Sequence, residues 1–286
     1  MANSQFSILN SQFKKFISPG AWFSMIYPTN WSESEDSENT FLFYDPVNWN
    51  GNFRISAYRK DAKFSDAKYF GKDSVQQELK TNETAALVKV GRYECAYSKE
   101  MFQEEGTYYV SHIWIVNAGN VAFECSFTVP KGGEVTDAQN IIESLEVRPE
   151  GQKYPAEIIP IRVAEISLVN EAYDWTVSTV KKQLKKDFQG VEEDLEKMQT
   201  VVESGSITPK QKEAWLSLGI TICVILTNEL EGFEWMTLID GNREAPVLQY
   251  TPTEQVIDPM RLVWSKIKAG EPCNVVEEYK NIIDKL

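Results

Sequence analysis

The segment VAFECSFTV at residues 121–129 decides the fold of the N-terminal half, because apolar and polar residues alternate along it. In a β-strand, successive side chains point to opposite faces of the sheet. The apolar face of this segment carries Phe123, Cys125, Phe127 and Val129. The alternation therefore predicts a strand that buries one face and exposes the other.

A second strand pattern, residues 107–116, precedes this segment, and Asn117-Ala-Gly-Asn120 joins the two. A short connection of Asn and Gly is typical of a β-hairpin turn, so the sequence predicts antiparallel pairing. Four further segments of this half have strand patterns, at residues 21–27, 40–45, 53–59 and 85–97.

Helices are expected between these strands. Ser65 can cap a helix that runs to Leu79, and Thr136 or Asp137 opens a shorter one. Residues 30–39 are rich in turn formers and carboxylates, which predicts a loop. We therefore expect residues 1–150 to form an α+β domain, with helices packed on an antiparallel sheet.

A stretch rich in Pro and Gly, residues 148–160, predicts a linker to a second domain over residues 151–286. Helical spacing dominates after it, and Thr208-Pro209 has the composition of a helix start. This half is expected to be mainly helical with one small β-hairpin. The expected helices lie at residues 162–188, 191–203, 208 onward, 259–268 and 275–286, and the hairpin at 234–250.

The charge of the chain argues against two classes of partner. The formal net charge is -13, with -6 on residues 1–150 and -7 on residues 151–286. Neither half has a basic block. A nucleic acid or an anionic membrane would be repelled at long range, so we expect neither as a partner.

Cysteine usage and the N-terminal segment favour a cytoplasmic protein. The cysteines lie far apart with no spacing typical of zinc ligands, so we expect buried thiols at Cys95, Cys125, Cys223 and Cys273. Met1–Asn10 contains no apolar secretory segment, and the longest apolar run is too short to span a bilayer. No nucleotide or metalloprotease motif is present, so no cofactor and no metal are expected.

Short motifs in the first half resemble a known family. They are Phe23-Ser-Met-Ile-Tyr-Pro-Thr-Asn-Trp31, Phe127-Thr-Val-Pro130 and Ile141-Ile-Glu-Ser-Leu145. In this order they resemble DUF3805, a bacterial domain of unknown function, and the PsbP/Mog1-like fold. The resemblance implies that fold over roughly residues 15–148. PsbP-like and Mog1-like proteins generally act by binding other proteins, so it also raises the expectation of a binding role.

The second half resembles DUF3806, another bacterial domain of unknown function. The resemblance rests on Leu195-Glu-Lys-Met-Gln199, Trp215-Leu-Ser-Leu-Gly219, Glu234-Trp235, Asp240-Gly241 and Gly270-Glu271. After the Leu-Gly pair this chain has bulkier residues than expected, which leaves the helix packing there open. Neither family implies catalytic residues that can be placed on this sequence.

His112 is the chain's only histidine, and Cys125 is its one potential catalytic partner in the predicted hairpin. A two-residue turn at Ala118-Gly119 would place His112 opposite Cys125, where the pair could form a thiolate nucleophile. A bulged turn would instead place Ser111 opposite Cys125. Since the thiol lies on the apolar face in either register, a structural histidine is the favoured interpretation.

Carboxylates offer two further candidates. Glu33, Glu35, Asp36 and Glu38 share the predicted loop, which could bind calcium but lacks the glycine turn of an EF-hand, so we favour a solvated loop. Asp240 could act as an acid or base with Glu234. In one regular strand, however, the two carboxylates would lie roughly 20 Å apart, too far to act on one bond.

Two tryptophans in predicted loops, Trp31 and Trp49, are candidates for binding another protein. Large aromatic side chains often anchor protein interfaces, although covering the sheet edge is an alternative role. The function that we expect is therefore protein binding or regulation without catalysis, through these loops or a groove between the domains. The alternatives are a hydrolase that uses carboxylates or the Cys–His pair, and a carrier with an apolar cavity under the sheet.

Overall fold

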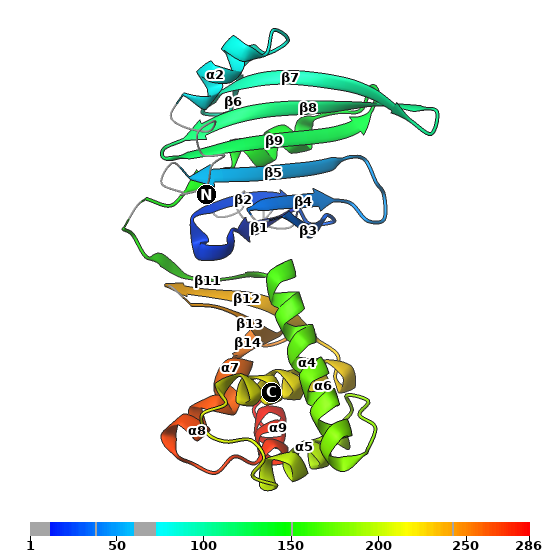
Figure 1. Cartoon of the computed structure of the whole chain (residues 1–286), viewed down its shortest axis with the longest axis vertical. Coiled ribbons are helices and arrows are strands. Elements are labelled where there is room, and N and C mark those ends of the chain that lie inside the picture. Colours follow the sequence, from blue (N-terminus) through cyan, green and yellow to red (C-terminus); the bar gives the residue numbers. More distant parts are fainter. Residues whose placement is uncertain (1–11, 38, 60–72, 150, 242) are drawn as a thin grey trace. The chain divides into compact units, whose positions relative to one another are not determined.

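The structure, a computed structural model, describes residues 12–37, 39–59, 73–149, 151–241 and 243–286. It divides into two compact units, Met1–Tyr154 and Pro155–Leu286. The first combines antiparallel sheets with helices, and the second is mainly helical with a small sheet (Figure 1). The predicted α+β class is therefore confirmed.

The described strands of the first unit form a larger sheet of order β3-β4-β5-β9-β8-β7-β6 and a smaller one of order β1-β2-β10. All the pairs in both sheets are antiparallel. Two described helices, α2 (Ser74–Thr81) and α3 (Thr136–Glu143), accompany them. The strands are β1 Phe13–Ile17, β2 Phe23–Pro28, β3 Ser32–Ser37, β4 Thr40–Tyr44, β5 Asn52–Arg59, β6 Ala86–Val90, β7 Tyr93–Glu104, β8 Thr107–Ala118, β9 Val121–Pro130 and β10 Glu146–Val147.

The core of this unit lies on one face of β9, as its alternation predicted. Phe123, Cys125, Phe127 and Val129 are all buried. The smaller sheet covers this face with aromatic side chains, and the ring of Phe23 meets that of Phe123 edge-on at 5.2 Å. Aromatic pairs in this geometry add stability beyond the area they bury.

The β8–β9 register differs from both predicted registers. The turn is Gly119-Asn120, so Ala118 pairs with Val121. Trp114 therefore lies opposite Cys125, and His112 lies opposite Phe127. The predictions were wrong because several turns are compatible with Asn-Ala-Gly-Asn, and only the packing of both strands selects one.

Three other segments of this unit differ from the sequence prediction or lie partly outside the described residues. The acidic residues 30–39 were expected to form a loop, but β3 lies within them and pairs with β4, which supplies hydrogen bonds that composition does not predict. The strand expected over residues 85–97 is divided by a turn at Gly91-Arg92 into β6 and the start of β7. Ser65, the expected helix cap, lies outside the described residues, and the helix that is described near the expected end is α2, Ser74–Thr81.

In the second unit, helices α4 and α6 pack on each other and on a small sheet of order β11-β12-β13-β14. Its first strand, β11, lies in the expected linker, because pairing with β12 overrides the local turn signals, and prolines are tolerated on an edge strand. The elements are β11 Tyr154–Pro160, α4 Val163–Leu184, α5 Asp194–Glu203, α6 Lys212–Glu229, β12 Phe233–Gly241, β13 Arg243–Tyr250, β14 Gln255–Ile257, α7 Pro259–Leu262, α8 Trp264–Ala269 and α9 Val275–Ile283.

Helix α6 begins at Lys212, one turn later than Thr208-Pro209 predicted. Gln211 has a non-helical ψ of 64°, so residues 208–211 form a separate turn, in which the Gln211 side chain accepts hydrogen bonds from Thr208. Further along α6, a Cβ on Gly219 would lie 2.1 Å from the Pro259 carbonyl oxygen. The missing side chain at Gly219 therefore lets α7 approach α6 closely.

A buried ion network ties the start of α4 to the small sheet. Arg162 and Glu165 are both buried, and the Arg162 guanidinium donates to Glu165 at 2.8 Å and to Glu244 at 2.8 Å. The Thr237 hydroxyl donates to Glu165 at 3.1 Å and accepts from the Arg162 backbone N–H. Each buried charge therefore has partners in the folded protein.

We predict that Arg162→Met lowers the free energy of unfolding of the second unit by about 3–5 kcal/mol, because it leaves Glu165 buried without its cation. Urea denaturation followed by circular dichroism measures the change. Lys181→Met is the matched control, since Lys181 pairs with Asp187 at the surface, and we expect it to cost less than about 1 kcal/mol. Equal losses in the two variants would contradict the assigned role of the network.

Candidate functional site

The loop between β4 and β5 holds Trp49 at the surface. The buried carboxylate of Asp45 accepts the backbone N–H groups of Val47 at 2.8 Å and Asn48 at 2.9 Å. It also accepts from the Asn30 amide at 2.6 Å. These hydrogen bonds, those of Asn48 and Val47 first, lower the pKa of Asp45. The ionised carboxylate therefore organises the turn that presents Trp49.

Trp49 belongs to a row of three aromatic rings, which we call the aromatic row: Trp49, Tyr109 and Phe102. The Trp49 ring meets Tyr109 edge-on at 6.0 Å, and Tyr109 stacks on Phe102 at 5.5 Å. Tyr109 lies opposite Phe102 in the β7–β8 pair. The Trp49 indole N–H donates to Asn52 at 2.6 Å, which fixes the ring. Trp49 and Phe102 are each 42% exposed, so the row presents aromatic surface to solvent.

The β7–β8 hairpin extends past its neighbour β6 (Figure 1), and the pairing places Phe102 and Tyr109 of the aromatic row in this extension. Pairing with β6 ends at Tyr97, whereas pairing with β8 continues to Glu104. On the other face of the same hairpin, Met101 is 61% and Tyr108 50% exposed. The hairpin end is therefore apolar on both faces. The sequence indicated only Trp49 of this row, because no local pattern around Phe102 and Tyr109 marks these two residues as a site.

His112 makes a hydrogen bond with tyrosine. Its Nδ1 lies 2.7 Å from the Tyr97 hydroxyl, and its ring stacks on Tyr97 and Trp114, each at 6.0 Å. Burial, and then the charge of Lys99, lowers the pKa of His112. This environment disfavours the charged imidazolium, and the hydrogen bond and ring contacts hold the side chain in place in the sheet.

Cys125 is fully buried, and burial raises the pKa of its thiol well above the usual range. The other three cysteines are also buried, as predicted. A thiolate nucleophile has to be ionised and accessible. The surroundings of Cys125 provide neither condition.

The remaining sequence candidates lie in different environments. Trp31 is only 1% exposed and stacks on Phe127 at 5.9 Å, so its side chain is part of the core. Asp240 is exposed on β12 opposite Arg243. Within the described ranges, no three His, Cys, Asp or Glu side chains gather closely enough to hold a metal ion. None of the described helices is long and apolar enough to cross a membrane.

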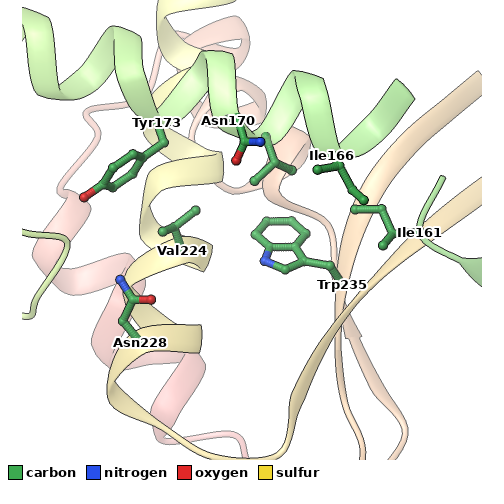
Figure 2. Close-up of a pocket in the computed structure, with 8 residues that line it drawn as sticks. Ile161, Ile166, Asn170, Tyr173, Val224, Asn228 and Trp235 are labelled. Atoms are coloured by element: carbon green, nitrogen blue, oxygen red, sulfur yellow. The ribbon is translucent and has the colours of Figure 1, made fainter. Parts of the chain in front are cut away.

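The second unit contains a pocket of about 540 Å³ between α4, α6 and β12 (Figure 2). None of the site residues named from the sequence lines it. Its lining includes Tyr173 from α4, Asn228 from α6 and Trp235 from β12. Tyr173 lies on the helix expected over residues 162–188, and the other two lie on elements that only the tertiary fold brings together.

These features define a mixed α+β protein with an exposed aromatic hairpin and a separate uncharged pocket. The sequence profile of DUF3805, a domain of unknown function, matches residues 11–170. The chain therefore belongs to the DUF3805 family. The profile of DUF3806, also a domain of unknown function, matches residues 194–279. Both resemblances recognised in the sequence are thereby confirmed.

Solved structures add one strong likeness and two weak ones. A crystal structure from Bacteroides thetaiotaomicron VPI-5482 has 62% sequence identity and a TM-score of 0.90, and the match covers 96% of this chain and 100% of that chain. Cyanobacterial PsbP from Synechocystis sp. PCC 6803 has 11% identity and a TM-score of 0.27, over 48% of this chain and 94% of that one. LpqN of Mycobacterium tuberculosis, described as involved in cell envelope biogenesis, has 13% identity and a TM-score of 0.29, over 51% and 97%. No curated protein matches this chain.

We predict that in Asp45→Asn the free energy of unfolding of the first unit falls less steeply as the pH is lowered than it does in the wild type. The native pKa of Asp45 is lowered, so its ionised form contributes stability above the unfolded value of about 3.9. That stability is lost as pH falls through the native pKa. Urea denaturation at a series of pH values measures the slope.

Asp137→Asn serves as the comparison, because its effect on the pH dependence of stability should have the opposite sign. Burial, and then Glu134, raises the pKa of Asp137, so this carboxylate costs stability as pH rises. Asp137→Asn should therefore make the free energy of unfolding fall more steeply as the pH is lowered. If Asp45→Asn and Asp137→Asn changed the slope in the same direction, the role assigned to Asp45 would be wrong.

Proposed function

We propose that this protein acts by binding another protein through the β7–β8 hairpin end. The observation that carries the proposal is the exposed aromatic row of Trp49, Tyr109 and Phe102. Aromatic and Met side chains are enriched at the centres of protein interfaces, where a few of them supply most of the binding energy. Rings already held by Asp45 and by stacking lose little conformational freedom on binding.

The charges around the row indicate the chemistry of the partner. Glu100 and Glu104 are exposed and share the face of Phe102, because they lie two positions from it on β7. Exposed Glu105 follows them. A partner with an apolar centre and a basic rim would complement this surface, and the acidic charge would speed its approach.

The backbone at the hairpin end favours the same conclusion. Among the described strands, none pairs with residues 98–104 of β7 on the side away from β8. Such an edge offers a row of N–H and C=O groups to an added strand. An extended segment of the partner could therefore pair with β7 while its side chains contact Met101 and Phe102.

Site-specific photo-crosslinking tests the proposal. A photoreactive residue placed at Phe102 in the full chain should crosslink one discrete protein with a basic surface in native lysate. The same residue placed at Leu87 is the matched control, because Leu87 is 54% exposed on β6 of the same sheet. We expect no discrete product from that position.

The double variant Trp49→Ser/Phe102→Ser should weaken binding of the crosslinked protein by roughly thirtyfold, which corresponds to the ~2 kcal/mol of an interface hot spot. Leu87→Ser should leave the affinity unchanged, and added salt should lower it. Equal products from positions 102 and 87, or no product from either, would rule out the hairpin end as the binding surface.

A further inference from the structure

The pocket of the second unit lies at the meeting of three elements and is separate from the hairpin end. Helix α4 contributes Ile166, Asn170 and Tyr173 at the spacing of one helical stripe. Helix α6 contributes Val224 and Asn228, and β12 contributes Trp235 (Figure 2). Its volume of about 540 Å³ is in the range of small-molecule sites.

Several polar groups that line this pocket have free hydrogen-bonding capacity toward the residues that the structure describes. Among the described residues, no group pairs with the Trp235 indole N–H, the Asn170 amide or the Tyr173 hydroxyl. The Asn228 amide donates to Gly190 at 2.9 Å and keeps its carbonyl oxygen as an acceptor. Figure 2 shows the Trp235 nitrogen on the side of the ring toward Val224. The pocket therefore offers donors and acceptors around an apolar wall.

The lining contains no charged side chain, although a quarter of the chain is charged. An anion would find no cationic side chain to pair with in this lining, and a cation would find no carboxylate. The chemistry of the pocket therefore fits a neutral ligand.

We propose that this pocket binds a neutral sugar. A sugar ring has an apolar C–H face that can pack on Trp235 and the Ile166 side chain. Its rim of hydroxyls both donates and accepts hydrogen bonds, which matches Asn170, Tyr173 and the indole N–H. A purely apolar ligand would displace water from these groups and leave them unpaired, at a cost in affinity.

Ligand-observed NMR with the full chain tests this site. The probes are neutral mono- and disaccharides that differ in hydroxyl configuration, at millimolar concentration. At least one should bind to the wild type. Trp235→Phe keeps a ring but removes the N–H, and Asn170→Asp replaces an amide by a charge. Each should weaken binding about fivefold to tenfold, the effect of one lost hydrogen bond.

Asn281→Asp is the matched control, because it adds the same charge on α9 of the same unit, away from the pocket lining. It should bind the saccharide as the wild type does. Circular dichroism checks that each variant is folded, and Asn170 is exposed, so its substitution should not disturb the core. Failure of every saccharide to bind, binding unchanged in both pocket variants, or tighter binding of a neutral dipeptide amide would overturn the proposal.

Discussion

The burial of alternate residues on β9 is the constraint on which the first unit depends. Because side chains alternate strictly along a strand, a slip of one residue would move Phe123, Cys125 and Phe127 from the core to the opposite face. The aromatic side chains of the smaller sheet close over that face, so a strand shifted by one residue would leave these side chains without their apolar cover. The pairings of β5 and β8 with β9 follow from this one choice.

The length of the β7–β8 pair explains why aromatic residues reach solvent at the hairpin end. This pair continues past the end of β6, so residues 98–104 of β7 have a strand neighbour on only one side among the described strands. Phe102 lies in this part of β7, Tyr109 of β8 pairs with it, and the loop organised by Asp45 adds Trp49 to them. A surface of this kind is stable because its rings support one another, and it remains apolar enough to bind a partner.

The second unit relies on a different kind of interaction. Arg162 links the start of α4 to β13 through Glu244, and it also forms a buried ion pair with Glu165. Loss of one member of this network would leave another buried charge without its partner. Gly219 permits the close approach of α7 to α6. These contacts hold α4, α6 and β12 in fixed positions, and the uncharged pocket is bounded by those elements.

The sequence by itself determined the α+β class, the alternation of β9, most helices and the burial of the cysteines, because strand and helix periodicities belong to the local chain. It also indicated Trp49 as a contact residue. Only the tertiary structure decided the β8–β9 register, the pairing of acidic β3, the strand within the expected linker and the burial of Trp31. It also brought Tyr109 and Phe102 into one row of rings with Trp49, and it placed Asn170 and Trp235 in the lining of one pocket. Each of these depends on contacts between segments distant in sequence, which local patterns do not encode.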